Sequence, residues 1–305
     1  MSTVATKWRA RLRRNAAGYA MLLPFAALFA GFLIWPLANS LYLSFTDFNA
    51  IKAPNFVGLD NFRRLWFDDD RFRHAVSNTV TYVTLSVTLT TLLALALALA
   101  FRGTRWRDRI MRTIFFLPAV TSTIALFLIW RWIFGVEDFG LANTVWRWLG
   151  GESMAWLATP RLTIPVLVLM AVWGGAGYGM VIFVAGLNAI PEELYEQARV
   201  DGASTIRQFW HITLPLLRPV TTYVVITGLI SAFQVFEAVY IVFRTQASVI
   251  GGVLDSGLMI VPYLYDMGFG KFQLGFASAI AWTLFLIIFV VSLVQLRVSR
   301  TLKDF

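Results

Sequence analysis

Three residues at regular spacing place hydrogen-bonding groups inside an apolar stretch of this chain. Ser231, Gln234 and Glu237 follow one another at intervals of three, which predicts a polar stripe along one helix. Polar side chains at membrane depth are costly and usually functional, so the stripe could contact a solute that crosses the membrane. The alternative for Glu237 is an ion pair with Arg131 or Arg244 near a membrane boundary.

A second candidate lies in the glycine-dense segment 173–179, which reads WGGAGYG. Trp173 and Tyr178 could stack on the flat face of a solute while each offers a hydrogen bond. Glycines such as Gly175 permit either a cavity beside a broken helix or close packing of two helices. These two interpretations are equally open from the sequence.

Other kinds of chemistry lack the residues that they need. The chain has no cysteine and only two histidines, His74 and His211, so disulfides, thiolate metal sites and a histidine-built metal site are not expected. It also lacks the phosphate-binding G-x-x-x-x-G-K-[ST] sequence, because Gly268–Lys271 has neither the spacing nor the following hydroxyl. We therefore expect no metal, no cofactor and no ATP hydrolysis by this chain.

The candidate residues must be positioned by membrane-spanning helices. The 305 residues are 58% apolar and 14% charged, with a mean hydropathy of +0.68, whereas soluble domains are about half apolar and about a quarter charged. A span needs about 20 apolar residues. The sequence predicts an all-α polytopic membrane protein with six transmembrane helices, and we favour an uncleaved first span over a signal peptide. The charge-free stretches are 15–46, 74–101, 113–130, 162–191, 219–236 and 272–296.

The basic residues indicate the orientation of these spans. Sixteen of the 26 lysines and arginines lie in the two termini and in segments 102–112 and 192–218. By the positive-inside rule these segments and both termini are cytoplasmic. Because the charges are divided among four short segments, a nucleic-acid partner is not expected. The predicted parts are a basic tail 1–17, a transmembrane domain 18–296 with an external loop 47–73 and a cytoplasmic loop 190–219, and a tail 297–305.

The loop 190–219 predicts two short helices joined by a turn. Pro191 suits the first turn of a helix, with acidic residues after it, and Gly202 ends or bends that helix. A second, apolar arm runs from about Ala203 until Pro215 and Pro219. Such a projection could fit a groove on a partner, although a plain link between two spans is the alternative.

The same loop resembles a known motif. Glu196–Ala198 (EQA), Gly202 four residues later and Ile212–Pro215 (ITLP) are similar to the EAA loop of permease subunits in binding-protein-dependent ABC importers. The resemblance, closest to the carbohydrate branch and to its first permease subunit, covers about residues 18–296. Two departures are Gln197 in the motif and Gly251-Gly252 without a following proline. Further similar segments are 56–62 (FVGLDNF), 112–118 (RTIFFLP), 139–143 (FGLAN) and 214–219 (LPLLRP).

The resemblance implies a fold, a function and partners. The fold would be that of a type I ABC importer permease in a bacterial or archaeal cytoplasmic membrane, translocating a di- or oligosaccharide by alternating access. The partners would be a second permease subunit in a heterodimer, two ATPase subunits that bind ATP and magnesium, an extracytoplasmic sugar-binding protein and membrane lipid. The ATPase-docking residues that it implies are Glu196, Ala198, Asp201, Gly202, Ile212, Leu214 and Pro215. Of the substrate-path candidates Trp173, Gly175, Tyr178, Ser231, Gln234 and Glu237, it supports Gly175, Tyr178, Gln234 and Glu237.

Two other classes compete with a permease. An ion-coupled carrier would use Glu237 as its coupling residue and would transport alone. An intramembrane enzyme would need a catalytic set, for which only Glu237 lies at membrane depth. Among importers, disaccharide, oligosaccharide and glycerol-phosphate systems share the pattern, and the lack of a dense basic cluster in the spans favours an uncharged sugar.

Overall fold

The protein is predominantly helical in the part that the computed structural model describes, residues 16–135, 140–243 and 250–301. The expected tail 1–17 lies mostly outside these ranges, whereas the first five residues of the expected tail 297–305 belong to the last helix. The one β-type pairing among described residues is an isolated bridge between Thr46 and Phe56. The elements in order are α2 Ala16–Phe29, η1 Ala30–Ile34, α3 Trp35–Leu43, α4 Asp60–Arg63, η2 Arg64–Asp68, α5 Asp70–Ala100, α6 Trp106–Val120, α7 Thr123–Ile133, α8 Leu141–Trp148, α9 Pro160–Asn188, α10 Glu192–Val200, α11 Thr205–Gln208, η3 Phe209–Thr213, α12 Leu214–Leu216, α13 Arg218–Phe233, α14 Glu237–Phe243, η4 Val253–Asp255, α15 Ile260–Tyr265, η5 Asp266–Gly270 and α16 Leu274–Thr301.

Four unbroken helical segments of the described chain are long and apolar enough to cross a membrane. They are Gly18–Leu43, which joins α2, η1 and α3, together with α5, α9 and α16. Two bent pairs, α6 with α7 and α11–α12 with α13, raise the number of candidate spans to six. The all-α polytopic class predicted from the apolar stretches is therefore confirmed, while two of the six spans differ in shape from the expectation.

The third apolar stretch does not form one continuous helix to residue 134. It turns by 97° between α6 and α7, where Thr121 and Ser122 adopt extended conformations with ψ of 149° and 121°. Pro118, in the last turn of α6, has no N–H to donate and its ring crowds the preceding turn. One helix was predicted from this stretch, and its bend was missed because counting apolar residues gave this proline no weight.

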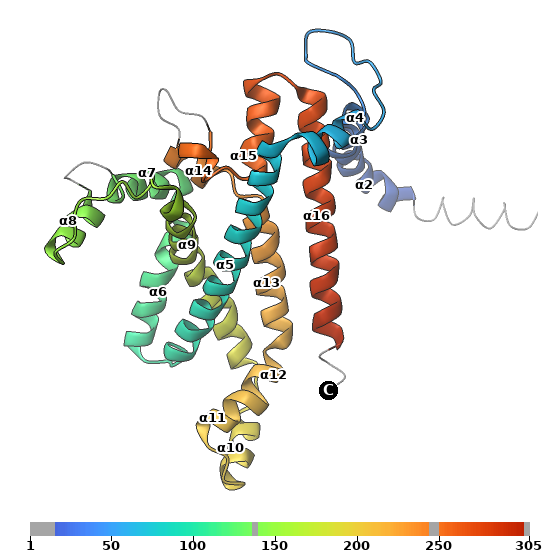
Figure 1. Cartoon of the computed structure of the whole chain (residues 1–305). Coiled ribbons are helices and arrows are strands. Elements are labelled where there is room, and N and C mark those ends of the chain that lie inside the picture. Colours follow the sequence, from blue (N-terminus) through green and yellow to red (C-terminus); the bar gives the residue numbers. More distant parts are fainter. Residues whose placement is uncertain (1–15, 136–139, 244–249, 302–305) are drawn as a thin grey trace, which may run out of the picture.

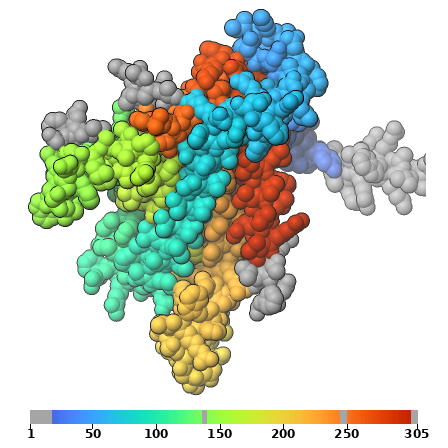
Figure 2. Space-filling view, in the orientation of Figure 1, coloured from blue at the N-terminus to red at the C-terminus, as the bar shows by residue number. Residues whose placement is uncertain are grey.

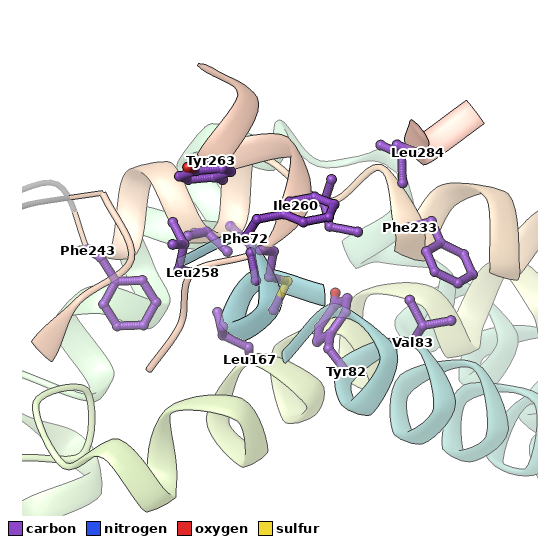
Figure 3. Packing of buried hydrophobic residues seen from close by; sticks show 14 of the residues in the cluster. Phe72, Tyr82, Val83, Leu167, Phe233, Phe243, Leu258, Ile260, Tyr263 and Leu284 are labelled. Carbon is purple, nitrogen blue, oxygen red and sulfur yellow. The ribbon is translucent and has the colours of Figure 1, made fainter. Parts of the chain in front are cut away.

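The core is built around the packing of α5 on α9. Figure 3 shows Phe72, Tyr82 and Val83 of α5 near Leu167 of α9 and residues of the α13–α16 region. A second buried cluster joins the far halves of α5 and α9 to α13, through Ala94, Met180 and Phe183 among others. In contrast, the apolar window of Gly18–Leu43 has no buried residue, so this helix is free to face lipid or another subunit.

The two ends of the molecule differ (Figures 1 and 2). At one end α10–α12 project beyond the bundle as a separate knob, and the C-terminal end of α16 lies toward the same side. At the opposite end α4, α15 and the start of α5 meet. The expected external loop 47–73 is partly helical here, since it contains α4 and η2 and α5 already begins at Asp70.

An ion-pair cluster, which we call the Arg71 clamp, holds this opposite end together. Arg71 donates from Nε and Nη2 to both carboxylate oxygens of Asp255, at 2.7 and 2.9 Å, and from Nη1 to Asp266 at 2.9 Å. Tyr263 donates to the carboxylate of Asp69. Burial and that hydrogen bond raise the pKa of the Tyr263 hydroxyl. The clamp joins the start of α5 to the chain between α14 and α16, segments about 190 residues apart.

Candidate functional site

A cavity of about 640 Å³ lies among α5, α6–α7, α9, α13 and α14. The sequence pointed to six residues for a solute path, and the structure places all six around this cavity. They are Trp173, Gly175, Tyr178, Ser231, Gln234 and Glu237. The structure thus brings together two groups of residues that are separated by some fifty positions in the chain.

The glycines of the glycine-dense segment have different surroundings in the α9 wall of the cavity, although α9 is unbroken from Pro160 to Asn188. Gly174 and Gly175 line the cavity. Gly177 instead meets α6, where an added Cβ would lie 1.9 Å from the backbone oxygen of Phe115. Gly179 meets α5, where a Cβ would lie 2.8 Å from the Cβ of Ala94. The glycines therefore let α6 and α5 approach α9 closely at Gly177 and Gly179, while Gly174 has open space at its Cβ position.

The aromatic residues of this wall are accessible. Trp173 is 44% exposed and Tyr178 is 52% exposed, and both line the cavity. Trp130 of α7 packs edge-on against Trp173 with centroids 5.4 Å apart and also lines the cavity. Its contact with Trp173 places Trp130 beside the candidate site.

The sequence predicted that the polar stripe lies along one continuous helix, and this prediction was wrong. α13 ends at Phe233, Gln234 caps it with φ −96° and ψ 15°, and Glu237 begins a separate helix, α14. Neither proline nor glycine occurs at this break. The bend instead accompanies tertiary packing, because α14 buries Ala238, Val239, Val242 and Phe243 and packs on α7. Ser231, Gln234 and Glu237 still face one cavity, but across a bend.

The two breaks face each other across the cavity. Thr121 and Thr123 at the α6–α7 break line it, as do Gln234 and Phe236 at the α13–α14 break. Non-helical backbone at membrane depth is tolerated where it lines a cavity, and discontinuous helices often build transport sites. Sequence reasoning missed Thr121 and Thr123, although the run Thr121-Ser122-Thr123 after Pro118 was an available signal. The ion-pair alternative through Arg244 falls outside the described residues.

The predicted docking loop has the expected two-helix shape. α10 ends at Val200, Gly202 adopts a left-handed φ of +78°, and the side chain of Ser204 accepts a hydrogen bond from the backbone N–H of Arg207. A hydrogen bond of 2.9 Å between the hydroxyls of Tyr195 and Thr213 joins the two arms.

The exposure of the docking candidates divides them into two sets. Glu196, Asp201 and Gly202 are exposed on the first arm and the turn, whereas Ala198 is half-buried. On the second arm Ile212, Leu214 and Pro215 are half-buried, so they contribute more to the packing of the loop than to its exposed surface. Three exposed apolar side chains add to the surface and were not among the candidates. They are Val200, Ile206 and Trp210, which are 88%, 73% and 59% exposed.

A comparison with known families identifies the architecture. Residues 90–304, which include most of the cavity-lining residues and the two-helix loop, match the family described as "Binding-protein-dependent transport system inner membrane component". The chain belongs to this family.

Similar proteins match nearly the whole chain and support its membership of this family. This permease is 36% identical over 292 residues to the arabinooligosaccharide transport system permease protein AraP of Bacillus subtilis, covering 95% of this chain and 90% of the relative. It is 31% identical over 295 residues to the trehalose/maltose transport system permease protein MalF of Thermococcus litoralis, covering 96% and 97%. One chain of a crystallised bacterial ABC transporter involved in alginate import superposes with a TM-score of 0.83 at 25% identity, covering 97% of this chain and 99% of that one.

The cavity and the two-helix loop are separate regions of this permease. The cavity lies inside the bundle, and the two-helix loop projects from one end (Figure 2). Among described residues no group of three or more histidines or carboxylates could hold a metal ion.

Proposed function

We propose that this chain is the substrate-translocating subunit of an ATP-driven, binding-protein-dependent importer of neutral di- or oligosaccharides. The observation that carries the proposal is the cavity at the two helix breaks, whose wall combines aromatic faces with hydrogen-bonding side chains. Trp173 and Tyr178 stack on sugar rings, and Ser231, Gln234 and Glu237 bind hydroxyls. Relatives named for arabinooligosaccharide and trehalose/maltose transport support the substrate class.

The charge of the cavity supports a neutral sugar. Glu237 is the one charged side chain among the cavity-lining residues that the structure describes. A carboxylate or phosphate on the solute would be repelled by Glu237 and would find no cation in this wall. A neutral hydroxyl can instead donate a hydrogen bond to it, which is stronger than a bond between neutral groups.

The other components of the transporter are separate subunits. Two ATPase subunits bind ATP and magnesium, one of them receiving the loop α10–α12, and this chain needs no cofactor of its own. A second permease subunit completes the solute path, with the exposed helix Gly18–Leu43 available to it or to lipid. A sugar-binding protein delivers solute at the opposite end. Both termini and α10–α12 lie in the cytoplasm, and ATP-driven closure switches the pair between inward-facing and outward-facing states.

Cavity variants test the substrate site. We expect Gln234→Ala and Tyr178→Ala each to lower sugar uptake by reconstituted transporter about five- to tenfold, because each removes a hydrogen bond or a stacking face. Tyr178→Phe keeps the ring and should retain more activity than Tyr178→Ala. Gln295→Ala on α16, outside the cavity, is the matched control. Normal uptake kinetics in both alanine variants would exclude this site, and uptake by the chain alone along an ion gradient would favour a carrier.

Loop variants test the docking of the ATPase. Replacing Gly202 by alanine or by leucine costs a similar amount of stability, about 1–2 kcal/mol, because its backbone is left-handed. A difference between the two variants therefore reports the effect of side-chain size at the contact with the ATPase. We expect Gly202→Leu to reduce the ATPase that copurifies at least tenfold below Gly202→Ala. Gly150→Leu is the control, since Gly150 has φ +87° and, like Gly202, an open Cβ position but lies outside the loop. Equal ATPase recovery in both Gly202 variants would refute the assignment.

A further inference from the structure

Four aromatic rings, which we call the aromatic run, lie in contact between α14 and η5. Phe236 stacks on Tyr240 with centroids 5.0 Å apart, and Tyr265 lies 5.1 Å from Phe236 and 5.4 Å from Tyr240. Phe269 continues the series 5.1 Å beyond Tyr265. Neighbouring rings are thus close enough that one extended molecule can contact several of them.

The aromatic run leads from the cavity to the surface. Its first ring, Phe236, is part of the cavity wall. Its last ring, Phe269, is 63% exposed and lies on η5, next to α15 at the end of the molecule opposite the α10–α12 knob (Figure 1). Phe236, Tyr240 and Tyr265 are half-buried between these two points.

The run is not part of the apolar core. Val235 and Leu264 pack against the large buried cluster, but their chain neighbours Phe236 and Tyr265 belong neither to that cluster nor to its packed shell. The backbone therefore directs aliphatic side chains into the core and aromatic ones away from it. Aromatic rings kept out of the core, next to a cavity, are available to a ligand.

We propose that the aromatic run is an outer sugar-stacking subsite, which lets this transporter bind oligosaccharides that extend beyond the cavity toward the external end. The inference rests on the proposed function and adds a chain-length preference to it. Sugar rings present C–H faces that pack on aromatic faces, and the tyrosine hydroxyls can exchange hydrogen bonds with sugar hydroxyls. The four rings carry no charge at neutral pH, which suits a neutral saccharide and not an acidic one.

The test compares sugars of different length. The complete transporter with its binding protein is reconstituted in vesicles, and uptake of a neutral oligosaccharide series of two to six units is measured below saturation. We expect Phe269→Ala and Tyr265→Ala to slow uptake of the longest imported member about fivefold or more while the disaccharide rate stays within twofold. Tyr265→Phe keeps the stacking face and should remain close to wild type. Phe272→Ala, which removes an exposed phenylalanine outside the run, is the control.

The possible outcomes separate the two proposals. Because Phe269 is largely exposed, its loss leaves the packing of the bundle intact, and a folding defect cannot explain its effect. Unchanged uptake of every length in Phe269→Ala and Tyr265→Ala, or an equal loss at all lengths, would overturn the outer subsite while leaving the cavity proposal standing. If Gln234→Ala and Tyr178→Ala also spare every length, the cavity proposal fails. A wild-type transporter that imports none of the neutral series would overturn both.

Discussion

The variant Gly177→Ala is expected to separate α6 from α9 and to lower the stability of the folded protein. An alanine Cβ at this position would lie 1.9 Å from the oxygen and 2.6 Å from the carbon of the Phe115 carbonyl. Backbone atoms cannot rotate away as a side chain could, so one helix must move. We expect a loss of about 3 kcal/mol, which corresponds to a fall of roughly 10 °C in the midpoint of thermal unfolding.

The matched control for this variant is Gly174→Ala on the same helix. No atom lies within 4 Å of the Cβ position at Gly174, so the added methyl meets open space, and alanine also favours helix by about 0.5–1 kcal/mol. Thermal unfolding of the purified assembly in detergent should therefore leave Gly174→Ala at or above the wild-type midpoint. Equal midpoints for the two variants would show that α6 and α9 do not approach this closely.

Removing the guanidinium in Arg71→Met is expected to release the opposite end of the molecule from α5. Asp255 and Asp266 would lose their shared cation while their side chains stay only 23% and 18% exposed. Leaving buried charges unpaired costs about 3–5 kcal/mol, and the partial exposure of this cluster reduces the expected loss to about 2 kcal/mol. The affected turn is strained, since Leu254 and Asp255 both have φ of 54°, and it depends on Arg71 and on the amide of Asn78 for support.

The neighbouring residue offers a control of the same charge and length. Arg73 pairs with Asp70 at 3.0 Å, but the two side chains are 55% and 85% exposed, so Arg73→Met should cost less than about 0.5 kcal/mol. Protection of amides 250–271 from hydrogen exchange would locate the effect, with faster exchange expected in Arg71→Met alone. A double variant with Asp255→Asn should be less than additive, because both changes break one pair. Similar stability of Arg71→Met and Arg73→Met would contradict the clamp.

Much of the architecture was accessible from local patterns. Long apolar stretches require helices in a bilayer whatever their neighbours are, and α5, α9 and α16 lie close to the ranges predicted from charge-free sequence. The two-helix loop was also predictable, because Gly202 and Ser204 act within their own turn. The polar candidates Gln234, Glu237 and Tyr178 were recognisable because such side chains are expensive in an apolar stretch.

The sequence by itself therefore determined the helical class, the apolar stretches that supply the candidate spans, the projecting loop and the polar and aromatic residue types that line the cavity. Only the tertiary structure decided that the fifth span bends after Phe233, since the packing of α14 on α7 accompanies that bend and no local breaker is present. It also decided which glycines of segment 173–179 pack and which line the cavity, because that depends on the approach of α6 and α5 to α9. Neither the Arg71 clamp nor the aromatic run could be predicted from the sequence, because each joins residues far apart in the chain.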